Sequence, residues 1–590
     1  MNSTSKKIIG LLFLLVFCTE TYSQRVYSVV FNQLPKDMQL YAREDNNIAE
    51  VPISGIIEIP GWSHLSVVVY RNGERVGYKK SVLNYAGQNS ASFEMKPQIK
   101  AELADYSLEV FACKTTDSIS LVKRNEIVAG DFYVISGQSN AAATIFGNWS
   151  SKYARTIARI PDNSPAITPA DTMWIPAAWS WTYAGAWGLE LQRQILEQEG
   201  IPSCVINGSL PGKKISDFLM DSDANPINVN SLYGSLVTRV NKAKPTKIRA
   251  FFWMHGEQEA LEYINNYPEQ YDQLYKKWVR DYPTVEQFIV VQTNLILLNH
   301  ENSVPLSGSI RDFLRRTKYL YPKTDHFTPI GTNGYDGIHY SRPGYEEFGQ
   351  KVFRFLRPTV YKSGDNDNVR SPDIKKAAFT SNLKNEIVLT FDEGQVLKWA
   401  NDTTVTGQDG QPLKLSLKDL FYLDGDETKS PFSAGKVDSN RVILTLKEPV
   451  EATKISYLPS YFIKNLPDPT GLKIGRFNGP FLMNRRGVGA FSFDKVTIEA
   501  SNVLGNEVLA EKSFFNAYPN PTRDVLNVSL EYVRGAEVEI RDITGKKLFS
   551  GSMLSQKDLE VEMTTWAEGI YILMVKTKDG RIGSRKIFKN

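Results

Sequence analysis

The sequence predicts a multidomain protein in which a central α/β domain, built on a parallel sheet, is flanked by all-β sandwich domains. The 590 residues are too many for one hydrophobic core and correspond to about three to five domains. Between residues 129 and 361, apolar runs alternate with longer helical stretches, whereas short β-branched and aromatic runs broken by turns precede and follow them. The first pattern is typical of a parallel sheet covered on both faces, and the second is typical of sandwiches.

The composition excludes several classes of protein. With 42% hydrophobic and 23% charged residues, the chain is neither disordered nor a membrane bundle. The net charge of +4 is small for this length, so the basic surface of a nucleic-acid binder is missing. We therefore expect no nucleic-acid partner, and no motif of the chain requires a cofactor.

Residues 1–23 have the pattern of a cleaved signal peptide. Two lysines precede an apolar stretch, and small or polar residues follow it to Ser23. The stretch is too short to cross a bilayer, so no integral membrane segment is expected in the mature chain. A lipid-bearing Cys18 is the alternative, although bulky Phe17 stands where lipoprotein cleavage needs a small residue.

Only Cys113 and Cys204 would remain in the mature chain. Two cysteines permit at most one disulfide and exclude a multi-cysteine zinc site. Two buried free thiols are the favoured interpretation.

The N-terminal domain, residues 24–128, is predicted to be a β-sandwich because short strands alternate with turn signals such as Asn72-Gly73. Its clearest predicted strands are residues 26–31, 65–70 and 107–112.

The central domain, residues 129–361, is where we expect the chemistry, because ligands bind at the carboxyl ends of strands in open parallel sheets. Its predicted strands are residues 131–136, 203–207, 248–254 and 287–293, and its predicted helices are residues 186–198, 232–241, 269–280 and 309–319.

Two further β-domains are predicted to complete the chain. A sandwich over residues 362–500 has its clearest strands at 386–391, 441–447 and 454–457. A small β-domain over residues 503–590 has strands at 525–530, 536–542 and 570–577.

Ser139 is the candidate nucleophile. It follows a predicted strand directly, and Gly137 permits a sharp turn before it. Ser136 is a competing candidate, but the strand pattern buries it. A serine hydroxyl needs a base within hydrogen-bond reach, usually an imidazole that a carboxylate orients.

His339 is the best of the five histidines as that base. It lies in the segment Asp336-Gly337-Ile338-His339, so one loop can supply both the imidazole and the carboxylate that holds it. Taken alone, this segment is equally compatible with a surface turn in which Asp336 caps a helix. Together with Ser139 in the same α/β domain, it predicts a Ser139, His339 and Asp336 catalytic set.

Four blocks, in order, carry a resemblance to a known family. They are Gly137-Gln138-Ser139-Asn140, the segment from Asn207 to Gly212, Trp253-Met254-His255-Gly256-Glu257, and Asp336 to His339 followed by Tyr345. This set resembles the SGNH (GDSL-like) hydrolases, specifically the sialate O-acetylesterase branch of carbohydrate esterases. Any one tetrapeptide is weak evidence, but four in order are specific.

The resemblance implies a three-layer, flavodoxin-like α/β/α domain that removes acetyl or similar acyl groups from sugar hydroxyls. Ser139 would carry the acyl group, and His339 would take the serine proton and later activate water. The amides of Ser139 and Gly212, together with a side chain of the third block at His255, would stabilise the oxyanion.

Two blocks depart from the family. Relatives usually have two adjacent glycines after a tryptophan where this chain has Leu210-Pro211-Gly212. The branch usually has Gln-Gly-Glu where this chain has His255-Gly256-Glu257, although a neutral imidazole can donate one hydrogen bond and Gln258 is a nearby substitute.

The acidic residues of the third block have two other interpretations. Glu257 orders the loop or is simply solvated. A metal site formed by His255, Glu257 and Glu259 is a further alternative, but no second histidine stands at ligand spacing, so we expect no metal.

Five of the ten tryptophans lie between residues 146 and 187, in a predicted long loop near the nucleophile. Exposed indoles there could stack on sugar rings, whereas buried ones would anchor the loop. For any single tryptophan, anchoring is the favoured interpretation.

The last domain resembles the C-terminal sorting domain of the type IX secretion system. The motifs are Ala517-Tyr518-Pro519-Asn520-Pro521, Asp542 to Gly545, Gly569 to Ile572 and a basic end at residues 585–589. The resemblance implies export through the type IX machinery across the outer membrane, and a location outside the cell or on its surface. A passive β-module is the alternative.

The sequence therefore predicts a secreted carbohydrate O-acetylesterase whose partners are an acylated carbohydrate and the type IX machinery. A carbohydrate-binding protein that has lost catalysis is the alternative, suggested by the altered third block. An esterase for lipids or peptides on the same scaffold is a third possibility.

Overall fold

A computed structural model describes most of the chain and divides it into two compact units, residues 1–501 and 502–590. The described residues are 28–145, 149–157, 173–177, 184–220, 228–262, 264–298, 307–500, 514–530, 535–553, 557–578 and 582–590. The predicted signal peptide lies outside them. Within the described residues, no helix is long and apolar enough to cross a membrane.

The N-terminal region consists of short strands whose inward residues alternate with exposed ones. In β7, for example, Ala91, Phe93 and Met95 are buried and the residues between them are exposed, as expected for a strand with one face in a core. The strands are β1 (Val29–Gln33), β2 (Leu40–Ala42), β3 (Ile48–Glu50), β4 (Ile53–Ile57), β5 (His64–Arg71), β6 (Glu74–Val82), β7 (Ala91–Met95), β8 (Gln98–Lys100) and β9 (Tyr106–Cys113).

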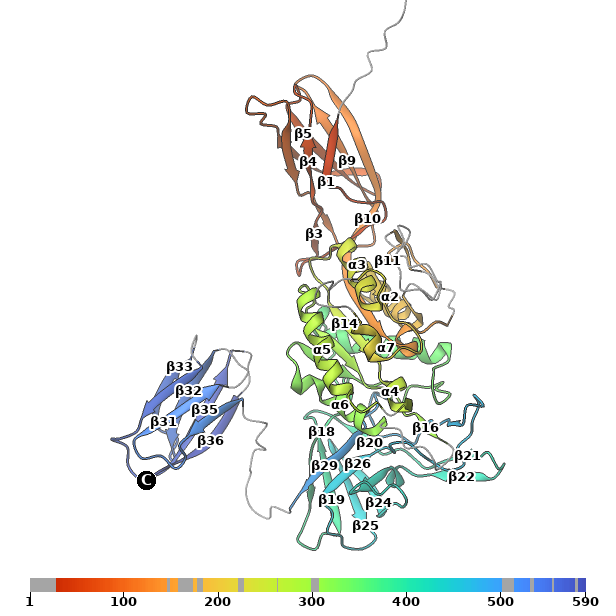
Figure 1. The fold of residues 1–590 in the computed structure, drawn as a ribbon, viewed down its shortest axis with the longest axis vertical. Coiled ribbons are helices and arrows are strands. Elements are labelled where there is room, and N and C mark those ends of the chain that lie inside the picture. Colours follow the sequence, from red (N-terminus) through yellow and green to blue (C-terminus); the bar gives the residue numbers. More distant parts are fainter. Residues whose placement is uncertain are drawn as a thin grey trace, which may run out of the picture. The chain divides into compact units, whose positions relative to one another are not determined.

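One long strand, β10 (Ser118–Gly137), belongs to both the N-terminal and the central region (Figure 1). Its first half pairs antiparallel with β9, and its second half pairs in parallel with strands of the central sheet. Burial follows this change, because the first half alternates between exposed and partly buried residues whereas the last eleven residues are all buried. A strand with neighbours on both sides and helices on both faces has no exposed side chain.

The central sheet has the order β12-β11-β13-β10-β14-β15-β17, and every pairing along it except β12 with β11 is parallel. Through β10 it continues into antiparallel strands of the N-terminal region, so the complete eleven-stranded sheet is mixed. The remaining strands of the region are β11 (Ala154–Ile157), β12 (Trp174–Pro176), β13 (Ser203–Asn207), β14 (Ala250–Met254), β15 (Phe288–Val291), β16 (Leu297–Leu298) and β17 (Thr324–Phe327).

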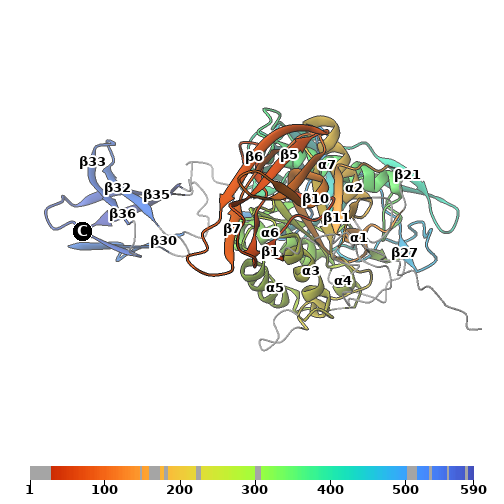
Figure 2. The same cartoon turned by 90° about the horizontal axis from the view of Figure 1, so that it is seen from above.

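Different helices cover the two faces of this sheet (Figure 2). Tyr133 and Ile135 of β10 share a core with α2 and α7, whereas Phe132 and Val134 share another with α3, α5 and α6. The helices are α1 (Ser139–Ala142), α2 (Ala186–Glu199), α3 (Leu232–Ala243), α4 (Glu257–Glu262), α5 (Tyr267–Asp281), α6 (Ser307–Leu320) and α7 (Arg342–Val360).

A buried ionic cluster joins the N-terminal region to the central sheet. The Asp131 carboxylate, which is fully buried, accepts from Arg43 Nη2 at 2.9 Å and from Arg249 Nε at 2.8 Å. Removing one partner of such a cluster would leave an uncompensated buried charge. The two regions are therefore joined by more than a linker.

The third region is built on a seven-stranded sheet of order β23-β26-β29-β18-β19-β25-β24. Its core also contains Leu295, Leu297 and Ile330, which belong to segments following β15 and β17. The strands are β18 (Ile374–Phe379), β19 (Glu386–Phe391), β20 (Leu397–Lys398), β21 (Thr403–Thr406), β22 (Pro412–Leu415), β23 (Phe421–Leu423), β24 (Phe432–Asp438), β25 (Arg441–Leu446), β26 (Lys454–Tyr457), β27 (Ile474–Gly475), β28 (Met483–Asn484) and β29 (Phe493–Glu499).

The second unit forms its core between a three-stranded and a four-stranded sheet. Its strands are β30 (Phe515–Tyr518), β31 (Val525–Leu530), β32 (Ala536–Asp542), β33 (Lys547–Ser552), β34 (Asp558–Glu562), β35 (Gly569–Thr577) and β36 (Ile582–Lys589).

The prediction of a multidomain, sheet-rich chain is confirmed. The predicted helices match α2, α3, α5 and α6 to within a few residues, whereas α7 and β17 were not predicted. Cys113 and Cys204 are both buried free thiols, as expected.

Candidate active site

Ser139 lies at the end of the central strand β10, as the first residue of the short helix α1. Gly137 has a φ of +140°, and a Cβ there would lie 2.0 Å from the Met254 carbonyl oxygen, so only glycine fits at this turn. Ser139 is partly exposed, whereas Ser136 is 2% exposed within the strand. Of the two serines, Ser139 is the one that a substrate can reach.

Asn140, the next residue, connects this turn to two distant segments. Its Nδ2 donates to Glu257 Oε1 at 2.9 Å and to the Ile338 carbonyl oxygen at 3.0 Å. Its Oδ1 accepts from the Tyr345 hydroxyl at 2.8 Å. Because Asn140 follows Ser139 and Ile338 precedes His339, this side chain holds the two predicted catalytic segments together.

The segment from Asp336 to His339 forms a tight loop held by its own carboxylate. Asp336 Oδ1 accepts from the backbone amides of Ile338 and His339, each at 2.8 Å, and the Asp336 amide donates to the His339 carbonyl oxygen at 2.9 Å. Gly337 supplies a φ of +114°. The spacing that predicted a shared loop therefore produces one.

The His339 imidazole is partly buried, and this burial lowers its pKa below the usual value. The negative charge of Asp336 opposes the shift. The ring is therefore neutral near pH 7, which is the form that can accept a proton from a serine.

The segment from Asn207 to Gly212 packs against the same turn. Asn207 Nδ2 donates to the Ala141 carbonyl oxygen at 3.0 Å, and the Leu210 amide donates to the Gly137 carbonyl oxygen at 3.1 Å. Gly212 is exposed and has a φ of +68°. Its amide is thus on a turn that contacts the nucleophile segment.

His255, the side chain expected to contact the oxyanion, lies in the core. The ring is fully buried and stacks between Trp253, at a centroid distance of 4.7 Å, and Tyr267, at 5.8 Å. Its Nε2 lies 3.0 Å from the Lys213 carbonyl oxygen, which can only accept. A neutral imidazole has one N–H, so this bond uses it, and burial lowers the pKa to about 3, which excludes a second proton.

In this arrangement the one N–H of the neutral ring is used by the Lys213 carbonyl oxygen. The imidazole fixes the residue that follows Gly212. The substitute Gln258 is also engaged elsewhere, since its Nε2 donates to Glu262 Oε1 at 2.5 Å.

Glu257 and Glu259 are two buried acids on α4. Glu257 faces Asn140, and Glu259 Oε1 accepts from the Ile215 amide at 2.6 Å. Burial raises the pKa of each to about 7. Glu257 therefore orders the loop around Asn140 and is not a solvated carboxylate, and the described residues contain no group of three side chains suited to a metal ion.

Three of the five clustered tryptophans lie among the described residues. Trp187 is fully buried and Trp174 is 5% exposed, which agrees with their anchoring the loop, while Trp149 is partly buried. Trp179 and Trp181 lie outside the described residues.

Sequence reasoning missed the roles of Asn140, Tyr345 and Gln138, whose Oε1 accepts from the Gly256 amide at 3.2 Å. The signal was present, because all three stand inside the blocks that carry the resemblance. Motif membership alone does not show which polar groups face one another.

Comparisons with known families match two parts of the chain. Residues 129–356 match the family described as carbohydrate esterase, sialic acid-specific acetylesterase. Residues 516–590 match the secretion system C-terminal sorting domain. No curated protein matches the chain.

Among solved structures, a carbohydrate acetylesterase from Xanthomonas citri is similar with a TM-score of 0.51 and 17% identity, covering 80% of this chain and all of that one. At this identity the similarity concerns the fold. A family two carbohydrate esterase from Cellvibrio japonicus overlaps with a TM-score of 0.24 and 10% identity, covering 57% of this chain and 98% of the other.

Proposed function

We propose that Ser139 of this chain removes O-acetyl groups from carbohydrates through an acyl-enzyme, because residues 129–356 match the sialic acid-specific acetylesterase family of carbohydrate esterases. The family match supports carboxylic ester hydrolase activity. The sorting domain at residues 516–590 directs it through type IX secretion to the cell surface or exterior.

The observation that carries this proposal is the hydrogen bond from Asn140 Nδ2 to the Ile338 carbonyl oxygen at 3.0 Å. It joins residues 198 positions apart in the chain, one next to Ser139 and the other next to His339. A nucleophile and a base must lie within hydrogen-bond reach of each other, so this contact supports their pairing.

In the proposed reaction, Ser139 Oγ attacks the acetyl carbonyl carbon while His339 accepts the hydroxyl proton. His339 then gives that proton to the departing sugar oxygen, which leaves the acetyl group on Ser139. In the second half, His339 takes a proton from water, the hydroxide attacks the acyl-enzyme, and acetate leaves as Ser139 regains its proton.

Asp336 keeps His339 in the tautomer that can accept at the serine side. Its Oδ1 is engaged by two backbone amides, so we assign Oδ2 to the imidazole. The oxyanion would be stabilised by the amides of Ser139 and Gly212. The Ser139 amide is the first of its helix and has no intrahelical acceptor, and His255 fixes the turn that carries Gly212.

We also propose the domain division expected from the sequence, with domains at residues 24–128, 129–361, 362–500 and 503–590. The central one would be the three-layer α/β/α fold of SGNH hydrolases. Parallel pairing along the central sheet and separate helix cores on its two faces support this assignment.

The test is hydrolysis of p-nitrophenyl acetate by the full chain and by two serine variants. Ser139→Ala is expected to lose activity by at least about 1,000-fold. The matched control Ser136→Ala changes a buried serine in the preceding strand and is expected to keep wild-type activity. A wild-type protein without turnover would favour a carbohydrate-binding role instead.

The sugar is tested by acetate release from acetylated sialic acids, acetylated xylan and acetylated pectin. Sialic acid is the first candidate because the family description names it. Preference for long acyl chains over acetyl would point to a lipid esterase.

A further inference from the structure

We propose that strand β27 of the third region is a positioning element of the active site, with Ile474 supporting the loop that carries Asp336 and His339. This inference rests on the proposed function of that loop. It assigns a catalytic purpose to a region that lies outside the matched esterase segment, residues 129–356.

The contact is with the two residues between the proposed catalytic pair. Gly337 is buried, and a Cβ there would lie 3.2 Å from Ile474 Cγ2 and 3.1 Å from the Gly475 carbonyl oxygen. Ile338 packs on a small apolar cluster that contains Ile296, Leu298 and Ile474. The loop backbone therefore rests directly on β27.

The opposite support of the loop comes from Asn140, which donates to the Ile338 carbonyl oxygen. The peptide between Asp336 and His339 is thus held by the nucleophile segment through a hydrogen bond and by β27 through apolar contact. The ends of the loop are held separately, since the Tyr335 hydroxyl donates to the Leu295 carbonyl oxygen and the Tyr340 hydroxyl accepts from Asn294 Nδ2. Ile474 therefore acts on the middle of the loop, opposite Asn140.

The strand β27 is itself attached to the central region. It pairs antiparallel with β16, with Leu297 opposite Gly475 and Leu298 opposite Ile474. β16 is also bonded to a second third-region segment, since the Leu298 amide donates to the Tyr461 carbonyl oxygen at 2.7 Å. The segment β16 of the central region therefore lies between two segments of the third region.

Arg311, a buried residue of α6, anchors the third-region segment that precedes Tyr461. Arg311 donates from Nη2 to the Pro459 carbonyl oxygen at 2.6 Å and from Nε to Ser492 Oγ at 2.8 Å. Gln292, just after β15, forms two further bonds to the Ser492 backbone, at 2.9 and 3.0 Å. These contacts fix the third region, to which β27 belongs, relative to the sheet that carries Ser139.

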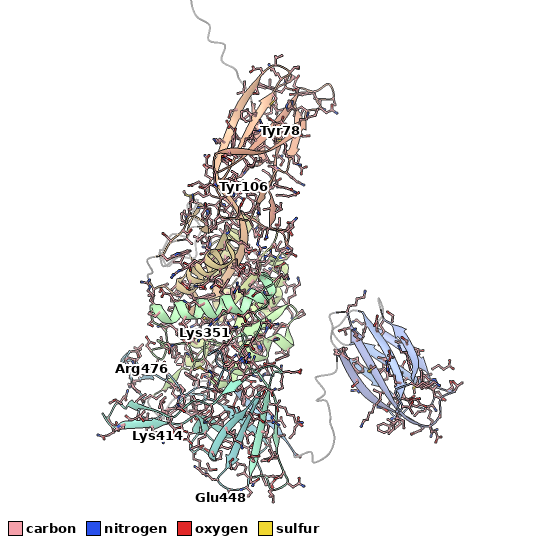
Figure 3. All side chains as sticks on the ribbon, turned by 180° about the vertical axis from the view of Figure 1, so that it is seen from behind. Tyr78, Tyr106, Lys351, Lys414, Glu448 and Arg476 are labelled. Atoms are coloured by element: carbon pink, nitrogen blue, oxygen red, sulfur yellow. The ribbon has the colours of Figure 1, made fainter. Side chains whose placement is uncertain are left out.

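The Ile474 side chain is well suited to this role because it is buried, unlike the exposed side chains nearby. It is 5% exposed, whereas Leu472 is 63% exposed and Arg476, which directly follows β27, is exposed at the surface of the first unit (Figure 3). Leu472, which is exposed and lies in the same segment, therefore provides a control.

The experiment compares Ile474→Ala, Ile474→Val and Leu472→Ala in the full chain. For p-nitrophenyl acetate, we expect Ile474→Ala to lower kcat by about tenfold with KM within about twofold, because a displaced base impairs the chemical step more than binding. Ile474→Val is expected to lose about threefold or less, and Leu472→Ala to match the wild type.

Hydrogen exchange of the peptide covering residues 335–340 gives a readout that needs no activity. We expect exchange at Ile338 and His339 to be about tenfold faster in Ile474→Ala, with β18 and β19 unchanged. Unaltered loop exchange together with unaltered kcat would overturn the inference.

If Ile474→Ala fails to fold, Ile474→Val decides the question, with faster loop exchange supporting the inference and unaltered exchange contradicting it. A wild-type protein that hydrolyses no ester contradicts the proposed function, yet the exchange data still show whether β27 supports the loop. The two failures are therefore distinguishable.

Discussion

His339 and His255 each have a carboxylate within four residues, but they lie in opposite environments. His339 is partly exposed on a loop beside Ser139, and its neighbour Asp336 is held by backbone amides. His255 is fully buried between two aromatic rings, with Glu259 Oε2 3.6 Å from its Nδ1. Similar spacing thus produces a candidate catalytic pair in one place and a packing element in the other.

The pair His255 and Glu259 differs in protonation from the pair His339 and Asp336. Burial lowers the pKa of His255 to about 3 and raises that of Glu259 to about 7, so both are neutral over much of the acid range. The His339 pKa is lowered by burial but supported by Asp336, so this ring can still exchange protons. A general base requires such reversibility, whereas a core residue is stabilised by staying neutral.

The largest effect is expected for His339→Ala. Loss of the base is expected to lower kcat/KM by about 1,000-fold or more, with the thermal unfolding midpoint unchanged because the ring is only partly buried. Steady-state kinetics and calorimetry measure the two quantities. A loss below about tenfold would remove His339 from the proposed mechanism.

Asp336→Asn is expected to lower kcat by about 100-fold or more while preserving the loop, since the amide oxygen can still accept from Ile338 and His339. The negative charge of Asp336 raises the His339 pKa, so its removal lowers that pKa. The acid limb of the kcat/KM profile is therefore expected to move to lower pH. A shift to higher pH would contradict the assigned electrostatics.

His255→Ala is expected to act on stability instead. Removing a buried ring stacked between Trp253 and Tyr267 is expected to cost about 3 kcal/mol of unfolding free energy. The folded fraction is expected to keep kcat within about tenfold, because the ring supports Gly212 only through Lys213. Denaturant unfolding followed by tryptophan fluorescence measures the first quantity. If kcat fell as far as in His339→Ala with stability unchanged, His255 would be a catalytic residue after all.

Glu257→Gln is expected to change how the free energy of unfolding depends on pH. The Glu257 pKa is raised from 4.5 to about 7, so the native protein keeps a proton that the unfolded chain releases above pH 4.5. This stabilisation is complete below pH 4.5 and is lost as pH rises through about 7. Between pH 4.5 and about 7, the free energy of unfolding of the variant is expected to rise relative to that of the wild type by up to about 3 kcal/mol. Unfolding titrations at several pH values measure this difference. A difference independent of pH would mean that Glu257 is ionised in the folded state.

Much of the fold was predictable because its signals are local. Residues 203–207 and 386–391 were predicted as strands with the bounds that β13 and β19 have. Helix α7 was missed, although Ser341 followed by Arg342-Pro343 is a recognisable helix start. Strand β17 has only four residues, which is too short for a periodic pattern to identify it.

Some features of the candidate site were also predictable from local sequence. Asp336 and His339 are three residues apart, so the sequence alone determined that one loop carries both, just as it determined that Ser139 follows a glycine turn at a strand end. Chain geometry within a few residues leaves few alternatives.

Only the tertiary structure decided that Asn140 bonds Ile338, that Ile474 lies against Gly337, and that His255 is enclosed by Tyr267 and the Lys213 carbonyl. These contacts join segments far apart in the chain. Burial and hydrogen-bond partners depend on which distant side chains fill the same space, and no local pattern of residues specifies that.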